Sequence, residues 1–200
     1  HDLDSYFVGS HNCLSVPFDH LLANGFNTRQ TDVRPAGSVN TAFQLVAVIF
    51  QLQSLQQFGG VSATHLDWTM VPYVRKSFAK HYKDGLKYLS DMPDWEDIDY
   101  EIEFMLKNPT EYAIDDLEWS AYNYKAYGYA VEQTRKEVHQ AVEGLYHNLN
   151  TLQSRSGNQL PFTSINYGTC TLLEGRMVIE ELLNVSIEGI ANYIKNLLDD

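Results

Sequence analysis

The feature that most constrains this sequence is a mostly apolar seam of residues, spaced three or four positions apart, between residues 115 and 155. Its members are Val131, Thr134, Val138, Ala141 (or Val142), Leu145, Leu149 and Leu152. An α-helix repeats every 3.6 residues, so this spacing gathers all of them on one side of a long helix. The seam predicts a helix that packs along other helices of the same chain. A symmetric contact with a second copy of the chain is the alternative.

A second long helix is predicted from Ser38 to Phe58. Ser38 is a favourable N-cap, because its hydroxyl can accept a backbone N–H of the first turn. Apolar residues then recur at three- and four-residue steps as far as Leu55, and Gly59-Gly60 ends the helix. A shorter helix precedes it and is stopped by Asn24-Gly25.

Two more helices are predicted to begin at capping boxes, in which a threonine is followed three residues later by an acid. Thr64 with Asp67 opens a helix that extends to Leu89, and Thr171 with Glu174 opens the last helix. One side of the first is expected to carry Trp68, Val71, Val74, Phe78, Tyr82 and Leu86, and the last helix to carry Met177, Val178, Leu182 and Leu183.

The segments that resemble strands are short. Residues 160–167 alternate between apolar and polar, and Gly168 forms a turn before the capped helix. Such a strand, glycine and helix aim backbone N–H groups at an anion, although many βα units look alike. The chain is 44% hydrophobic and 20% charged, which is typical of a globular domain. We therefore predict a helix-rich α/β fold.

The acidic net charge and the shortness of the apolar runs exclude two classes of partner, nucleic acids and membranes. The net charge is −12, from 26 Asp and Glu against 14 Lys and Arg. A surface this acidic repels a phosphate backbone, so binding to nucleic acid is not expected. The longest apolar run, Leu45–Phe50, is far too short to cross a membrane, and no leader peptide is apparent. A cytoplasmic protein is the expectation.

No metal site is predicted within the chain. The only cysteines, Cys13 and Cys170, lack metal-ligand spacing, and the seven histidines form no zinc signature. Asp97, Asp99 and Glu101 crowd together but lack the glycine and the spacing of a calcium loop.

Several separated motifs occur in the order of one known family. In the first part of the chain they are His1-Asp2-Leu3-Asp4, Asn12-Cys13-Leu14, Arg34-Pro35 with Ser38, and Phe58-Gly59-Gly60. In the last part they are Asn150-Thr151-Leu152, Gly157-Asn158-Gln159-Leu160-Pro161-Phe162-Thr163 and Glu174-Gly175-Arg176. Together they resemble the anaerobic, class III ribonucleotide reductases over essentially the whole chain.

The resemblance implies that residues 1–200 are the front portion of a ten-stranded α/β barrel that encloses the active site of a radical enzyme. Enzymes of this family reduce ribonucleoside triphosphates to deoxyribonucleoside triphosphates. They use a glycyl radical made by an iron–sulfur activase with S-adenosylmethionine, and they carry a structural zinc. Because the glycyl-radical segment and the zinc cysteines do not occur in residues 1–200, no cofactor is expected within the chain, and the chain alone is expected to be inactive.

The resemblance also assigns a role to Cys13, whose motif is that of a cysteine on the first barrel strand. That cysteine takes part in the loss of the 2′ hydroxyl as water, and a thiol on a buried strand is chemically suited to this step. Without the family, a small core residue is the simpler interpretation. Cys170 instead resembles a strand-to-helix turn of the family, and no radical chemistry is assigned to it.

Further residues are expected near the substrate. His1 and Asn12 adjoin Cys13 in the motif and are candidates to contact the ribose, with His1 as a possible proton carrier. For His1, hydrogen bonds with nearby acids are an equal alternative. Thr163, Ser164 and Gly168 are expected on the substrate side, where backbone N–H groups would help to hold the triphosphate.

The family is dimeric and binds a deoxynucleotide or ATP effector near the subunit interface. The long helices 67–89 and 115–155 would hold such a site, and the first carries a basic run: Arg75, Lys76, Lys80 and Lys83. Lys80 is the predicted effector contact, because a cation suits a phosphate; a solvated helix face is the alternative. A noncatalytic helical module for dimerisation or effector binding is the alternative function.

Overall fold

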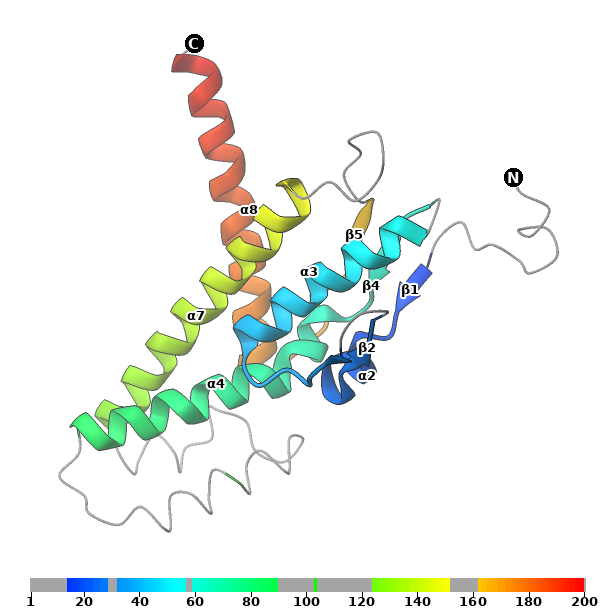
Figure 1. The fold of residues 1–200 in the computed structure, drawn as a ribbon. Coiled ribbons are helices and arrows are strands. Elements are labelled where there is room, and N and C mark those ends of the chain that lie inside the picture. Colours follow the sequence, from blue (N-terminus) through cyan, green and yellow to red (C-terminus); the bar gives the residue numbers. More distant parts are fainter. Residues whose placement is uncertain are drawn as a thin grey trace.

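The computed structural model describes residues 14–28, 32–56, 59–89, 103, 124–151 and 162–199. A small sheet lies beside long helices that extend away from it (Figure 1). The prediction of a helix-rich α/β fold is confirmed for this part of the chain. Among these residues, no helix is both long enough and apolar enough to cross a bilayer.

Three short strands form a parallel sheet: β1 (Leu14–Val16), β4 (Val61–Ala63) and β5 (Thr163–Ile165), in the order β1-β4-β5. Each strand joins the sheet beside the preceding one after a helical crossover, as in successive βαβ units. A separate antiparallel pair joins β2 (Phe26–Asn27) to β3 (Asp32–Val33). The described strands thus make an open sheet and not a closed barrel.

Helices α2 and α3 begin and end largely as the sequence predicts. In α3 (Val39–Gln56), the Ser38 hydroxyl accepts the backbone N–H of Thr41 at 3.3 Å, which confirms the N-cap. The shorter α2 (Phe18–Asn24) ends at Gly25, whose φ is +74°. A Cβ at Gly25 would overlap the carbonyl oxygen of Val33, so glycine is required there.

The start of α4 (Leu66–Leu89) differs from the predicted capping box. The backbone N–H of Leu66 donates to the carbonyl oxygen of Asn166, just after β5, at 3.0 Å. The Asp67 carboxylate instead accepts hydrogen bonds from the segment that follows β5. Trp68 is also misplaced by the periodicity, since it is 42% exposed and donates to the Thr169 hydroxyl.

The seam predicted in the longest helix is confirmed in α7 (Tyr124–Thr151), except that Val131 is only half-buried and Leu152 lies outside the described residues. Its buried positions include Ala130, Thr134, Val138, Ala141, Leu145 and Leu149. They pack within the chain, because α7 contacts α3, α4 and α8. At one crossing, a Cβ on Gly85 of α4 would lie 3.1 Å from the Ala126 backbone of α7, so the two helices approach closely there.

The last helix, α8 (Leu173–Asp199), runs beside α7 (Figure 1). Its expected apolar residues Met177, Val178 and Leu182 are buried, whereas Leu183 is 47% exposed. The capping box predicted for this helix is absent, because the side chain of Glu174 points to a tertiary partner on α4. The apolar faces of these helices and of the sheet join in one core.

Candidate functional site

One face of the parallel sheet carries a row of three serines. Ser15 of β1 is in register with Ser62 of β4, and Ser62 is in register with Ser164 of β5. Ser15 and Ser164 are exposed, whereas Ser62 is half-buried and its hydroxyl lies 3.5 Å from the carbonyl oxygen of Leu14. The strands thus present neighbouring hydroxyl groups on one surface, which we call the serine face.

The opposite face of the same strands is packed into the core. Val16, Val61 and Ala63 are at most 4% exposed, and side chains alternate between the two faces along a strand. Parallel sheets normally have both faces covered. An open hydroxyl surface on such a sheet is therefore suited to face a polar ligand or the lumen of a larger enclosure.

The turn after β5 is held by a single carboxylate. Oδ2 of Asp67 accepts the backbone N–H groups of Gly168, Thr169 and Cys170 at 3.0, 2.8 and 2.8 Å. Burial favours a raised pKa for Asp67, but these backbone hydrogen bonds, with one from Trp68, hold the pKa below its ordinary value. These N–H groups are already bonded within the chain, so they are not free to bind a phosphate.

A hollow of about 370 Å³ opens beside this turn. It is lined by Gly168, Cys170, Thr171, Arg176, Ile179 and Glu180. The guanidinium of Arg176, within the predicted family motif, brings a positive charge to the first turn of α8, while Glu180 brings a negative charge one turn later. The hollow is therefore mixed in charge.

A buried ion pair fixes the start of α8 against α4. Nε of Arg75 lies 2.5 Å from Oε1 of Glu174, and the two side chains are 1% and 0% exposed. The sequence assigns Arg75 to a basic run open to phosphate or solvent, and this is wrong because its charge is buried and paired. Both terminal nitrogens of Arg75 and the second oxygen of Glu174 have no partner among the described residues.

Cys170 is a free thiol in the core, 5% exposed. Burial raises its pKa, so it is held as the unreactive protonated thiol. Gly175 packs against it so closely that a Cβ on the glycine would overlap the sulfur. These contacts agree with the expectation that Cys170 lies in a strand-to-helix turn.

The structure describes only some of the residues predicted near the substrate. His1, Asn12 and Cys13 lie outside the described residues. Ser164 belongs to the serine face, while Thr163 is in register with Val61 and lies on the opposite face. Ser15 and Ser62 were not predicted, because their alignment depends on pairing between strands that are far apart in the chain.

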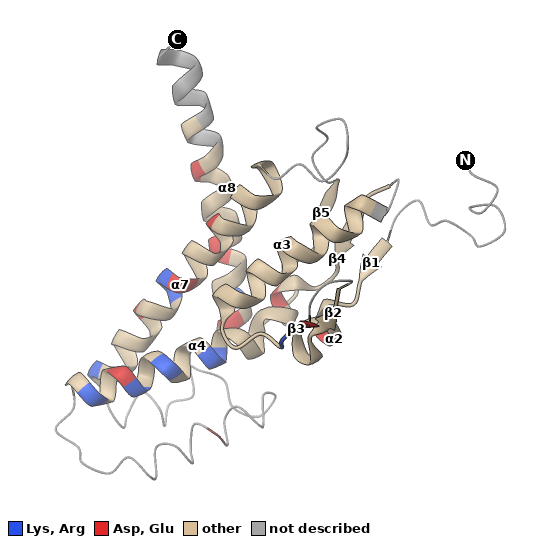
Figure 2. Ribbon diagram, viewed as in Figure 1, with Lys and Arg blue, Asp and Glu red and all other residues tan. Residues whose placement is uncertain are grey.

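Lys80 lies elsewhere, on the exposed side of α4, where cationic residues follow the helix (Figure 2). On α7, opposite it, Glu137 accepts hydrogen bonds from His81 Nε2 at 2.9 Å and from the Ser77 hydroxyl at 3.1 Å. The bond from His81 and, less strongly, the charge of Lys80 contribute to a lowered pKa for Glu137. Lys80 is thus an exposed cation next to the contact between α4 and α7.

Successive parallel βαβ units, with an open hydroxyl face and a hollow after a strand, define a class: a parallel α/β domain with a polar face suited to a ligand. Comparison with known proteins is more specific. Residues 1–197 match the family model for the anaerobic ribonucleoside-triphosphate reductase. The chain therefore belongs to the anaerobic ribonucleoside-triphosphate reductase family.

Individual relatives agree with the family model. The chain is 28% identical to the anaerobic ribonucleoside-triphosphate reductase of Escherichia coli (strain K12), over 98% of this chain and 23% of that protein. It is 28% identical to the enzyme of the same name from Enterobacteria phage T4, over 95% of this chain and 26% of the phage protein. The chain spans about a quarter of the length of these relatives.

Proposed function

We propose that this chain forms the front part of the catalytic barrel of an enzyme that reduces ribonucleoside triphosphates to deoxyribonucleoside triphosphates. The observation that supports this best is the serine face, a hydroxyl-lined surface on three adjacent parallel strands. In a closed barrel of about ten strands, one face of each strand faces the lumen and the other packs against the surrounding helices. The buried face of this sheet packs in the second way, which leaves the serine face for the substrate.

Cys13 is the proposed reactive residue. It precedes Ser15 by two positions, and the alternation of side chains along a strand would place both on the serine face. By family resemblance, its thiol would take part in the loss of the 2′ hydroxyl of the ribose, donating a proton to the hydroxyl so that it departs as water. The glycyl radical of the whole enzyme, made by an iron–sulfur activase with S-adenosylmethionine, would supply the radical chemistry; like the structural zinc, it would belong to the rest of the protein.

The remaining proposed contacts surround this thiol. Ser164 would meet the substrate from β5, and His1 and Asn12 would orient the ribose hydroxyl groups. The N–H of Gly168 is bonded to Asp67, so it would not contact the substrate. Gly168 would instead contact the substrate through its carbonyl oxygen, or allow close approach because it has no side chain. Thr163 belongs to the other face, and its contact with the substrate stays a prediction.

The paired long helices α4 and α7 would form a dimer contact with a site for a deoxynucleotide or ATP effector. Lys80 is the proposed phosphate contact, since it is an exposed cation beside that helix pair. A noncatalytic module for dimerisation or effector binding is the second candidate function. The same exposed cations favour this second function, but it does not explain the serine face. Either function would operate in the cytoplasm.

The two cysteines allow a matched test in the full-length protein that contains this segment. Cys13→Ala is expected to abolish reduction of ribonucleoside triphosphates by the activated enzyme. Cys170→Ala is expected to retain activity, because Cys170 is a buried core thiol that faces Gly175. Equal activity of the Cys13→Ala variant and the wild type would remove Cys13 from the mechanism.

A further inference from the structure

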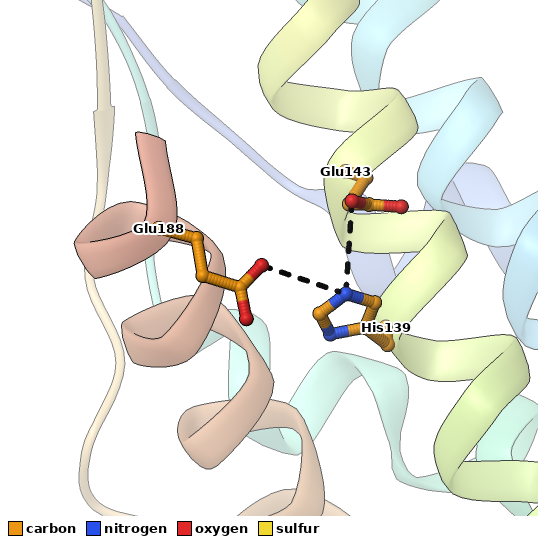
Figure 3. A group of neighbouring side chains, drawn as sticks. All are labelled: His139, Glu143 and Glu188. Carbon is orange, nitrogen blue, oxygen red and sulfur yellow. Dashed lines mark ion pairs between the residues drawn. The ribbon is translucent and has the colours of Figure 1, made fainter. Parts of the chain in front are cut away.

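A second polar site lies away from the serine face, between α7 and α8. His139 and Glu143 are one turn apart on α7, and Glu188 reaches toward them from α8 (Figure 3). One potential ligand atom of each residue lies within 4.8 Å of the others. Their side chains are 30%, 54% and 58% exposed, so an ion from solvent can reach them.

The imidazole of His139 is held in one orientation by a nearly buried carboxylate. Its Nδ1 lies 2.8 Å from Oε2 of Glu181, whose side chain is 5% exposed. The other oxygen of Glu181 accepts a hydrogen bond from Arg135 at 3.3 Å, which fixes the carboxylate. Histidines that bind metals are commonly held this way, with one ring nitrogen donating to a carboxylate and the other free to coordinate.

This arrangement points Nε2 of His139 at the two remaining carboxylates. Nε2 lies 3.6 Å from Oε1 of Glu143 and 3.9 Å from Oε2 of Glu188. Ligand atoms at about 2.1 Å from a tetrahedral zinc ion would be about 3.4 Å apart. Small rotations of two exposed glutamate side chains would therefore close the site around an ion.

The local charge also favours a cation. Glu143, Glu181 and Glu188 surround one imidazole, and Arg135 is shared with a further acid, Glu180, at 2.6 Å. Negative charge at this contact between α7 and α8 thus exceeds the positive charge of Arg135. Either a proton on His139 or a bound metal ion would reduce the repulsion between the two helices.

We propose that His139 Nε2, Glu143 and Glu188 bind a divalent transition-metal ion of the Zn²⁺ type, which joins α7 to α8. One nitrogen and two carboxylate ligands suit zinc, whereas calcium and magnesium prefer sites made of oxygen alone. Water would complete the coordination. The site lies away from the serine face, so the proposal is independent of the proposed reduction of ribonucleotides. The sequence shows no zinc signature because Glu188 follows Glu143 by 45 residues.

The test uses the full-length, tag-free protein from which surface-bound metal has been removed. This protein is titrated with Zn²⁺ in competition with a chromophoric chelator. The wild type is expected to bind one more equivalent than His139→Gln, and Glu188→Gln is expected to lose the same equivalent. The matched control is His147→Gln, because His147 is an exposed histidine two turns further along α7. This control should bind Zn²⁺ like the wild type.

A second variant separates metal binding from folding. Glu181→Gln keeps all three proposed ligands but weakens the orientation of the imidazole, and an affinity loss of about 10–100-fold is expected. Added Zn²⁺ should raise the Tm of the wild type and leave that of His139→Gln unchanged. Equal stoichiometry and affinity in the wild type and His139→Gln would overturn the site. An equal loss in His147→Gln would also overturn it, since it would indicate binding by scattered surface histidines.

Discussion

Two polar regions of this molecule differ in how far their charged side chains are buried and paired. Around the turn after β5, Asp67 and the Arg75–Glu174 pair are buried, and each carboxylate is bonded to a fixed partner in the chain. Between α7 and α8, most of the carboxylates around His139 are exposed. Their negative charge exceeds the positive charge nearby. The first arrangement fixes the fold, whereas the second leaves room for an ion.

This difference in burial predicts which substitutions will destabilise the fold. A buried charge that loses its partner is left in a medium of low polarity, and the cost is large. An exposed charge that loses its partner returns to water, and the cost is small. Substitutions near the turn should therefore destabilise the fold, and substitutions between α7 and α8 should chiefly change ion binding.

The largest effect on stability is expected from Glu174→Ala. It leaves the guanidinium of Arg75 buried without its carboxylate, and the free energy of unfolding should fall by about 3–5 kcal/mol. Urea unfolding followed by tryptophan fluorescence measures this change. The control is Arg75→Met with Glu174→Leu, which removes both charges and should cost much less. A Glu174→Ala variant as stable as the wild type would contradict a strong role for this pair.

A smaller effect, with a distinct pH dependence, is expected from Asp67→Asn. Loss of the charged acceptor for three backbone N–H groups should lower the free energy of unfolding by about 1–3 kcal/mol at neutral pH. Because the pKa of Asp67 is lowered by folding, its contribution is complete above the ordinary aspartate pKa and is lost as the pH falls through the folded value.

The difference between wild type and Asp67→Asn should therefore shrink below about pH 4. Unfolding curves at several pH values between neutral and acidic measure this directly. A difference that stays constant over the whole range would show that the ionised carboxylate does not hold the turn.

The smallest effect on stability is expected between α7 and α8, where the charged side chains are exposed. Arg135→Ala breaks ion pairs to Glu180 and Glu181, but the Arg135 side chain is 43% exposed. Without added metal, the free energy of unfolding should change by at most about 1 kcal/mol. The same urea unfolding assay applies. A loss as large as that of Glu174→Ala would show that the two regions do not differ as described.

The helices could be predicted from the sequence because their signals are local. The seam of α7 and the N-cap of Ser38 depend on residues a few positions apart. The same local reasoning failed for Asp67 and Glu174, which fit capping boxes in sequence but bond to partners about 100 residues away. A local pattern cannot report which tertiary partner competes for a carboxylate.

The candidate site was accessible to sequence reasoning only in part. Ser164 was predicted near the substrate because it follows a family motif, but Ser15 and Ser62 join it only through strand register. Register between distant strands is fixed by packing of the whole sheet, and a single strand of three residues carries little information about it.

We propose that the serine face, with Cys13, is the substrate side of the protein. The most direct measurement is the rate of thiol alkylation in the full-length protein, read by mass spectrometry with and without a ribonucleoside triphosphate. Cys13 should react in the free protein and be protected by the nucleotide, while Cys170 should react only after unfolding. Alkylation of Cys13 at the same rate with and without saturating nucleotide would contradict the claim.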